Sequence, residues 1–409
     1  MKSTKITKMA YRYYSNGDIS EAIKLYKQAA ESDDAKAQYN LGLLLYKQAK
    51  NNSDYKESFK WFEKAAQMGF ANAQYKAGQM YENRLVVSSD NKKAFDWYIQ
   101  AAKQGHEKAE KKCQLMAEEL AEEGYPPAQY YLGLMYDRDS ILEDAEKWYT
   151  KAANQGFVKA YYKLGKHFYW KHYFIENELV KESKEVLDDY KKKAIEWFTR
   201  AANAGDAEAL NELGIMYRDG DLVDKDYLIA KDYFEKAANQ GYSEAQCHLA
   251  YFYLSGEKIQ QDYSQAYFWL QKAAKQNSAG AQYGLGFMFE NGLGVEPSYS
   301  KAIRWYVKSA RNGYYEADYR LGLFSFAGVV GKINFKMALQ FWEKASSLDA
   351  LNTLSSTYYN AKYCLSCMYL YGLGTDKNIE KSENLWNECR DSLNQEDKDE
   401  IDQLFAEVL

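Results

Sequence analysis

Proline is scarce in this chain. Only three prolines occur among 409 residues, and no segment is rich in proline, glycine or serine. Linkers between independent domains often have such a composition. A chain of this length would ordinarily be expected to form two or three globular domains. The absence of a linker favours one continuous, elongated domain instead.

An excess of charge of one sign is also lacking. The 53 basic and 58 acidic residues give a formal net charge of -5, and no dense basic stripe stands out. Proteins that bind nucleic acids usually carry such a basic surface. We therefore expect no nucleic-acid partner.

Long apolar runs and a regular cysteine pattern are absent too. No run approaches the roughly 18 apolar residues of a membrane span. The N-terminal segment MKSTKITKMAYRYY has no apolar core or small-residue cleavage site. The five cysteines are odd in number and irregularly placed, which indicates free thiols in a reducing compartment. We expect a cytoplasmic location and no membrane span.

Residues of the common catalytic and metal sites are few. The four histidines include no pair at the spacing of a helical zinc site. Cys364 and Cys367 have the spacing of a redox motif, but they fall within an expected helix and no strand precedes them, so structural thiols are expected. The glycine cluster at 292–294 lacks the Lys-Ser/Thr of a nucleotide-binding loop. We expect no catalytic residue, no metal and no cofactor.

A repeat occupies almost the whole chain. The pattern Ala-x-Ala-Gln-Tyr-x-Leu-Gly occurs at 279–286 and, with Ala for Leu, at 71–78, and a Trp-Tyr-x-x-Ala-Ala-like segment follows each copy. The last position of the pattern recurs mostly every 36 residues, at Gly42, Gly78, Gly133, Gly165, Gly214, Ala250, Gly286, Gly322 and Ser366. Such a period indicates one helical unit that is copied and stacked, because no single copy buries its apolar face alone.

Each copy predicts a hairpin of two helices. In one unit, Ala281, Leu285 and Phe289 recur at helical spacing, glycines interrupt the pattern, and Ala302 and Trp305 resume it. We expect the small residues of the first helix to allow a close approach of the second helix. Trp305 is then expected to fill the space beside them.

The tryptophans support the same register. Eight of the nine lie at one position of the second helix or, for Trp342 and Trp386, one residue away from it. We predict that these eight belong to the core. Trp170 is outside the pattern, and two interpretations remain: it covers an inserted segment, or it is an exposed anchor for a partner.

These residues resemble the Sel-1-like repeat family, a helical-hairpin relative of the tetratricopeptide repeat, over about residues 35–392. The resemblance implies an all-α fold, a right-handed α-solenoid superhelix of stacked helical hairpins whose first helices line the concave face. Residues 1–34 are typical of a plainer tetratricopeptide-like hairpin. Residues 393–409 place Ile401, Leu404, Phe405 and Val408 on one stripe, as expected of a capping helix.

The repeat is irregular in three places. Residues 106–124 supply only one helix, a half-repeat, and eight extra residues fall near 348–357. A longer insertion lies near 171–190. Insertions in repeat arrays often collect on the face that binds a partner.

The groove-facing positions of the first helices are expected to be the second, fifth, ninth, twelfth and thirteenth. In the N-terminal half they are polar, with Lys47, Glu82, Asn83, Asp137 and Arg138. In the C-terminal half they are apolar, and a tightly coiled superhelix would bury them whereas an open one would offer them to a partner. With Trp170 included, the candidate partner-binding residues are Trp170, Tyr251, Leu254, Phe287, Leu323, Phe326 and Tyr371.

The sequence therefore favours a non-enzymatic scaffold or adaptor that binds a protein partner in its concave groove. A second hypothesis is an immunity or inhibitor protein that neutralises a cognate toxin. It predicts one tight partner, whereas an adaptor predicts several weaker ones. A small-ligand sensor or an enzyme is the third hypothesis, and it requires a closed pocket with convergent polar groups.

Overall fold

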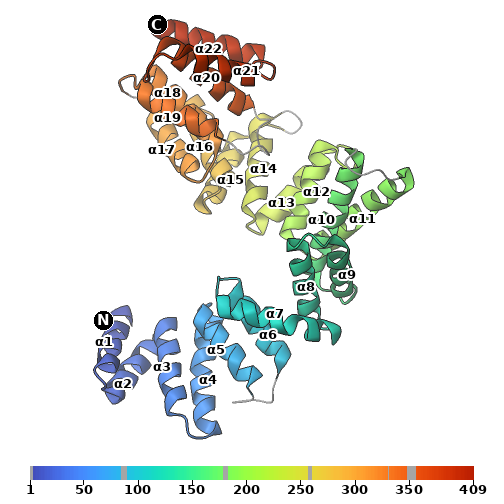
Figure 1. The fold of residues 1–409 in the computed structure, drawn as a ribbon, viewed down its shortest axis with the longest axis vertical. Coiled ribbons are helices and arrows are strands. Elements are labelled where there is room, and N and C mark those ends of the chain that lie inside the picture. Colours follow the sequence, from blue (N-terminus) through green and yellow to red (C-terminus); the bar gives the residue numbers. More distant parts are fainter. Residues whose placement is uncertain (1–2, 84–89, 178–182, 257–259, 330, 348–355) are drawn as a thin grey trace. The chain divides into compact units, whose positions relative to one another are not determined.

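The computed structural model describes residues 3–83, 90–177, 183–256, 260–329, 331–347 and 356–409. These residues form 22 α-helices and no strand (Figure 1). The predicted all-α solenoid of stacked hairpins is confirmed. The helices group into two compact units, 1–200 and 201–409, and the boundary falls inside α11 (Lys184–Asn203). The expectation of one continuous domain stays a prediction.

The helices of the first unit are α1 (Ser3–Ser15), α2 (Ile19–Ala30), α3 (Ala35–Gln48), α4 (Asn52–Gln67), α5 (Ala71–Glu82), α6 (Asn91–Ala102), α7 (Glu107–Glu122), α8 (Pro126–Arg138), α9 (Leu142–Asn154), α10 (Val158–Glu176) and most of α11. Those of the second unit are α12 (Ala207–Asp219), α13 (Tyr227–Asn239), α14 (Ser243–Ser255), α15 (Tyr263–Lys275), α16 (Ala279–Asn291), α17 (Tyr299–Arg311), α18 (Tyr315–Ala327), α19 (Phe335–Ala345), α20 (Ser356–Tyr371), α21 (Ile379–Cys389) and α22 (Gln395–Val408).

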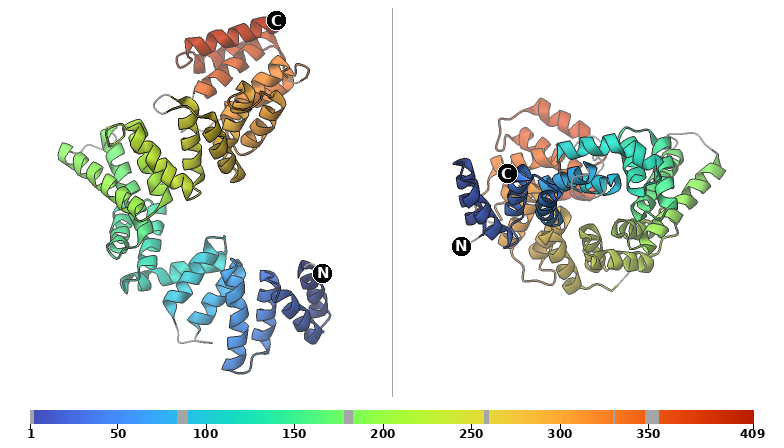
Figure 2. Two further views of the ribbon diagram at one scale, coloured as in Figure 1. Left: turned by 180° about the vertical axis from the view of Figure 1, so that it is seen from behind. Right: turned by 90° about the horizontal axis from the view of Figure 1, so that it is seen from below.

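Within each unit, consecutive helices pack as hairpins, and the second helix of a hairpin contacts the first helix of the next (Figure 2). Local backbone hydrogen bonds fix the turns between successive hairpins. After α17, Gly313 adopts a left-handed conformation with φ of 80°, and the next N–H, from Tyr314, donates to the carbonyl oxygen of Ser309. A left-handed C-terminal cap of this kind favours glycine, and it recurs after most second helices.

The core of seven hairpins pairs a glycine with a large ring. A Cβ added to Gly286 would lie 2.5 Å from Cε1 of Tyr306, and Tyr306 is fully buried. The prediction that Trp305 fills this space is therefore wrong, because the face of α17 that meets α16 carries the following residue. The same pairing occurs in Gly42–Phe62, Gly78–Tyr98, Gly133–Tyr149, Gly165–Phe198, Gly214–Phe234 and Gly322–Trp342.

The tryptophans mostly lie at the edge of this core. Trp61, Trp269 and Trp342 are buried, whereas the other five in the repeat register are half-buried. Lysine or arginine side chains cover several of them, as Lys308 does with its Nζ 4.1 Å from the ring centroid of Trp305. A cation above an indole ring is favourable, so these tryptophans tolerate partial exposure.

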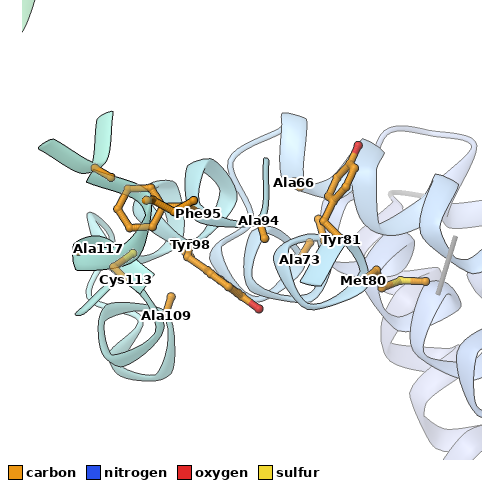
Figure 3. Packing of buried hydrophobic residues seen from close by; sticks show 14 of the residues in the cluster. Ala66, Ala73, Met80, Tyr81, Ala94, Phe95, Tyr98, Ala109, Cys113 and Ala117 are labelled. Carbon is orange, nitrogen blue, oxygen red and sulfur yellow. The ribbon is translucent and has the colours of Figure 1, made fainter. Parts of the chain in front are cut away.

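The half-repeat at 106–124 contains the single helix α7. Figure 3 shows Phe95 of α6 beside a row of small residues on α7, which includes Cys113 and Ala117, while the ring of Tyr98 points away from them. Because α7 has no second helix of its own, α8 follows it directly. Tyr125, just before α8, then donates its hydroxyl to Asp96 of α6 at 2.7 Å.

The C-terminal helix α22 covers the apolar face of the last hairpins. Ile401 and Phe405 are buried, and the ring centroid of Phe405 lies 4.4 Å from that of Phe326. The insertion near 171–190 lengthens α10 and α11. Its residues 178–182, and the extra residues 348–355, lie outside the described part of the chain.

Candidate functional site

Three of the predicted partner-binding residues line one groove in the second unit. Tyr251 and Leu254 of α14 and Phe287 of α16 border an open hollow of about 550 Å³. Its wall comes from α12, α14 and α16, the first helices of three successive hairpins, and from the segments that follow them. The full lining is Arg218, Asp219, Lys225, Tyr227, His248, Tyr251, Phe252, Leu254, Ser255, Phe287 and Leu293.

One end of this groove is apolar. Leu254 and Phe287 are half-buried, so each presents part of its side chain to the hollow. The hydroxyl of Tyr251 donates to the carbonyl oxygen of Gly280 at 3.1 Å, and burial raises the pKa of Tyr251 well above its usual value. Tyr251 therefore joins α14 to α16, while its ring contributes to the wall.

The other end is polar. The Nε and Nη2 atoms of Arg218 each donate to the carboxylate of Asp219 at 2.7 Å, and Nη1 lies 3.2 Å from Nδ1 of His248. Burial, together with the charge of Arg218, lowers the pKa of His248 to about 4. The imidazole is therefore neutral near pH 7, and its Nδ1 accepts a hydrogen bond from the guanidinium.

Three other hairpins carry a carboxylate at the position of Arg218. Glu290, at the end of α16, accepts a hydrogen bond from the Tyr306 hydroxyl and forms an ion pair with Arg320 at 3.5 Å. The acid thus ties its own helix to the second helix of the hairpin and to the next hairpin. We call this contact the acid–tyrosine–base tie. The corresponding sets are Glu82–Tyr98–Lys112 and Asp137–Tyr149–Lys163.

Two of the three hairpins that line the groove lack this tie, and the third, α16–α17, has it. Arg218, Phe234 and His248 occupy its three positions across α12, α13 and α14.

In the following hairpin, Leu254, Leu270 and Gly284 occupy the same positions. Phenylalanine and leucine have no hydroxyl to donate, and glycine has no side chain, so neither set can form the tie. Arg218, His248 and Leu254 border the hollow, whereas three other hairpins have polar side chains joined at these positions.

The predicted residues near the C-terminus do not share this groove. Phe326 is fully buried by Phe405 of α22, so the prediction that it is available to a partner is wrong. Leu323 is half-buried against the same cluster. Tyr371 is 48% exposed and borders a second hollow of about 560 Å³ beside α22.

Trp170 lies in the first unit, at the C-terminal end of α10. Its side chain is 44% exposed and stacks on Phe174 with the ring centroids 5.9 Å apart. Tyr173 meets the indole edge to face. Trp170 is thus a member of an exposed aromatic cluster and is not part of a hairpin core.

The predicted polar positions of the first unit are largely engaged within the chain. Glu82 and Asp137 belong to acid–tyrosine–base ties. Lys47 donates to the Tyr14 hydroxyl at 2.9 Å, and Arg138 pairs with Glu110 at 3.8 Å. These side chains stabilise the solenoid, which lowers their availability to a partner.

Sequence reasoning missed the charged side chains of the groove. Arg218 is at the twelfth position of its helix, one of the positions predicted to face the groove, but it is charged whereas the predicted binding residues are apolar or aromatic. His248 is at the sixth position, which was not expected to face it. Aligning the chain's own repeats would have shown that an arginine stands at residue 218, where three other repeats have an acid.

The described residues offer little to redox or metal chemistry. Cys364 and Cys367 are both buried, and burial raises the pKa of the Cys367 thiol to about 12, which disfavours the reactive thiolate. In these residues no three His, Cys, Asp or Glu side chains gather as metal ligands would. No helix among them is both long and apolar enough to cross a bilayer.

Comparison with known proteins was informative at the family level. No curated protein gave a significant match. Among solved structures, a protective antigen of uropathogenic Escherichia coli strains with an SLR fold is 26% identical, with 90% of this chain and 79% of that chain covered and a TM-score of 0.48. A Sel1 repeat protein from Oxalobacter formigenes is 23% identical, with 93% and 90% covered and a TM-score of 0.47.

An immunity protein from Pseudomonas aeruginosa is 17% identical, with 60% of this chain and 81% of that chain covered and a TM-score of 0.35. The family described as Sel1 repeat matches residues 7–34, 35–70, 71–106, 126–157, 183–206, 207–242, 243–278, 279–314, 316–349 and 360–388. These ten segments make up most of the sequence; nine of them each span a helical hairpin, and 183–206 contains α11 alone. The chain therefore belongs to the Sel1 repeat family.

Proposed function

We propose that this protein is a non-enzymatic scaffold that binds a segment of a partner protein in the groove formed by α12, α14 and α16. Sel1 repeat proteins are generally protein-interaction scaffolds. The observation that carries the proposal is this open, partly apolar hollow, at which two of the three lining hairpins lack the acid–tyrosine–base tie. Of the residues at the tie positions, Arg218, His248 and Leu254 line the hollow, whereas Phe234 and Leu270 are fully buried.

The shape of the groove suits a segment of protein better than an enclosed small molecule. Small-molecule sites usually bury most of their ligand. Here Leu254 and Phe287 stand half-buried in an open hollow, with Arg218 beyond them. Aromatic and apolar anchors beside an arginine are frequent among the residues that supply most of the energy of an interface.

The polar lining does not form a nucleophilic site. Ser255 is the lining residue with an aliphatic hydroxyl, and its Oγ lies 3.4 Å from the carbonyl oxygen of Phe252. His248 is hydrogen-bonded to Arg218, a contact that does not activate a nucleophile. A serine nucleophile needs an adjacent base, so this arrangement supports a binding role.

The proposal is tested by capture from a lysate of the source organism with the full chain as bait. The wild type is compared with the double variant Leu254→Ala, Phe287→Ala. Leu115→Ala is the matched control, because Leu115 is 77% exposed on α7 and lies outside the groove. We expect the groove variant to lose the captured partner and the control to retain it.

Affinity measurements with the purified proteins then give the size of the loss in binding free energy. The double variant should weaken the complex by about 2 kcal/mol or more, roughly 30-fold in Kd, while circular dichroism shows unchanged helicity. Equal affinity would place the binding surface elsewhere. One stoichiometric, tightly bound partner would favour the immunity or inhibitor hypothesis, whereas several weaker partners would favour an adaptor.

A further inference from the structure

The second helix α17 carries a basic outer face. Its charged side chains recur at spacings of three, four and three residues, so they share one side of the helix. They are Lys301, Arg304, Lys308 and Arg311, and we call them the α17 basic face. All four are exposed, and α17 contains no acidic residue. The expectation from the sequence that no basic stripe stands out is therefore wrong for this helix.

No acid of the described chain forms an ion pair with the α17 basic face. On the helices packed around α17, Glu290 belongs to a tie, and Glu343 accepts a hydrogen bond from a tyrosine of α20 at 3.4 Å. Asp318 is buried, and Glu316 interacts with a tyrosine of the groove. Glu296 is the one acid within residues 291–313, and it precedes the helix. The four cations are thus left with solvent as their main counterpart.

Other second helices show that this charge is not a general property of the repeat. The equivalent positions of α13 carry Ile229, Asp232, Lys236 and Asn239, and those of α11 carry Lys193, Glu196, Arg200 and Asn203. In both helices the acid pairs with the base one turn later, at 2.6 Å in α13 and 2.7 Å in α11. A base equivalent to Lys308 recurs in most hairpins, so Arg304 and Arg311 distinguish α17.

The stability of α17 does not account for the face. Like charges three or four residues apart on a helix repel one another and destabilise it slightly. Lys301 also lies in the first turn, where the helix dipole disfavours a cation. Four such side chains without acids between them therefore point to a role outside the helix.

The preceding hairpin extends the positive surface. Lys272 and Lys275 of α15 are equivalent to Lys308 and Arg311, and α15 also contains no acid. The Nδ2 atom of Asn312 donates to the carbonyl oxygen of residue 277 at 3.4 Å, so the C-terminal ends of α15 and α17 lie side by side. The two helices together therefore present six cations.

The α17 basic face surrounds a shallow hollow of about 480 Å³. Ile303, Trp305 and Val307 complete its lining, and each of the three is half-buried. None of the residues around this hollow lines the groove of α12, α14 and α16. The two surfaces are therefore separate.

We propose that the α17 basic face is a second interaction surface, which binds an acidic segment of a protein partner carrying several Asp or Glu side chains. The guanidinium groups of Arg304 and Arg311 can each donate two parallel hydrogen bonds to a carboxylate, which lysine cannot do. Lys301 and Lys308 add charge between and beside them. This inference goes beyond the proposed function, because it does not use the groove.

The charge of the surrounding unit favours a short acidic segment over an extended polyanion. Residues 201–409 contain 20 basic and 29 acidic residues, a net charge of -9. A bilayer or a nucleic-acid duplex would extend beyond the α17 basic face and meet this negative charge, whereas a short segment meets the local positive field.

The side chains of α17 also disfavour lipid and single-stranded nucleic acid. Single strands bind mainly by stacking on aromatic rings, but Lys308 already covers Trp305, with its Nζ 4.1 Å from the ring centroid. Peripheral helices insert apolar side chains into a bilayer, but Ala302 and Tyr306 are buried within the hairpin. The face offers charge at its surface, which carboxylates complement.

The chain itself suggests a variant that removes the positive face and keeps the fold. Arg304→Asp, Arg311→Asn introduces into α17 the residues that α13 has at these positions, where the acid pairs with the following lysine. Lys56→Asn, Lys60→Asp changes the net charge equally at exposed positions of α4 and is the matched control. Arg304→Gln, Arg311→Gln provides an independent reading if the first variant folds poorly by circular dichroism.

The probe is a phage-displayed library of random 12-residue peptides selected on the intact wild-type chain. Clones that bind the control but not the Arg304→Asp, Arg311→Asn variant are taken as binders of the α17 basic face. We expect these clones to be enriched in Asp and Glu. Synthetic peptides from them should bind both α17 variants at least about tenfold more weakly, since hydrogen bonds between charged groups contribute on that scale. Their affinity should also fall as salt is raised, because exposed charges are screened.

Each outcome supports or overturns the inference. A selection without clones that depend on Arg304 and Arg311, or with dependent clones that are not acidic, would overturn it. So would phosphatidylserine vesicles or a single-stranded RNA that bind the wild type more tightly than the peptides and lose binding in the variant. Self-association of the wild type that the variant abolishes would assign the face to a second copy of this chain instead.

The groove variant separates this inference from the proposed function. The acidic peptides should bind the Leu254→Ala, Phe287→Ala variant as tightly as the wild type, because these two residues lie in the other hollow. Loss of the peptides in that variant would place them in the groove and overturn the inference about α17 alone. Capture of a partner through the groove would be unaffected by the α17 variants.

Discussion

The ring of Phe326, in the last turn of α18, packs against Phe405 of the C-terminal helix with the two centroids 4.4 Å apart. Both side chains are at least 97% buried, so α22 closes a face of the last hairpins that would otherwise be exposed to solvent. The ends of a repeat array require such a cap, because a terminal repeat has a neighbour on one side only.

This contact predicts the effect of removing one ring. Phe405→Ala should lower the free energy of unfolding of the C-terminal hairpins by about 3 to 5 kcal/mol, because a large buried side chain is lost and a cavity remains. Urea unfolding followed by circular dichroism measures the change. Leu409→Ala is the control at a position 63% exposed, and it should change stability by less than about 0.5 kcal/mol. Similar losses for the two variants would show that α22 is not docked.

The pairing of glycine with a ring predicts a contrast within α16. Gly286→Ala should destabilise the protein by about 1 to 3 kcal/mol, because its Cβ would overlap the Tyr306 ring in a packed core. Gly280→Ala lies on the same helix, where an added Cβ would be 3.4 Å from its nearest neighbour, Sγ of Cys247.

Alanine has the higher helix propensity, so Gly280→Ala should be neutral or stabilising by up to about 1 kcal/mol. Thermal unfolding of the two variants side by side gives the comparison. If Gly286→Ala were as stable as Gly280→Ala, the close approach of α16 and α17 would not be a requirement of the hairpin.

A third contrast concerns two tryptophans. Trp342 is fully buried beside Gly322, and Trp342→Ala should cost about 3 to 5 kcal/mol. Trp170→Ala should cost less than about 1 kcal/mol, because its side chain is 44% exposed. Chemical unfolding measures each variant, and equal losses would place Trp170 in the core.

The burial of Asp318 predicts how the free energy of unfolding depends on pH. The corresponding residue of other hairpins is glutamine, as in Gln246, whose Nε2 donates to the carbonyl oxygen of Ala238 at 3.1 Å. Asp318 is 4% exposed and has no hydrogen bond in the described part of the chain. Burial raises its pKa to about 6, and the charge of Lys344 opposes that shift.

Because the pKa of Asp318 in the folded protein is above its usual value of 3.8, protonation favours the folded state. The stabilisation that comes from protonated Asp318 is fully present below pH 3.8 and is lost as the pH rises through 6. Asp318→Gln should therefore raise the free energy of unfolding at pH 7.5, by up to about 3 kcal/mol, and flatten its dependence on pH between about pH 4 and 6.5. Urea unfolding across this range tests it, with Asp391→Asn, at an exposed position, as the control. An unchanged pH slope in Asp318→Gln would contradict the assignment.

The period of the sequence predicted the hairpins, since a repeat of 36 residues with small residues on one helix and aromatic residues on the next has few other solutions. It did not identify which ring meets the glycine. Trp305 and Tyr306 differ by about 100° around their helix, and the rotation of α17 that selects Tyr306 depends on its packing against α16 and α18.

The groove was predictable in its position more than in its chemistry. Tyr251, Leu254 and Phe287 followed from the expected helix faces, because those positions repeat with the period. Phe326 has the same position as Leu254 in its own helix, yet α22 covers it. A contact made by a segment outside the repeat cannot be inferred from the repeat.

The missing acid–tyrosine–base ties have a mechanical consequence. Each hairpin touches mainly its neighbours, so an array of them responds to force as springs connected in series. The two hairpins from α12 to α15 lack the acid–tyrosine–base tie that joins α16 and α17 to α18. A bound segment that bridges α12 and α16 would supply there the connection between hairpins that the tie supplies at Glu290.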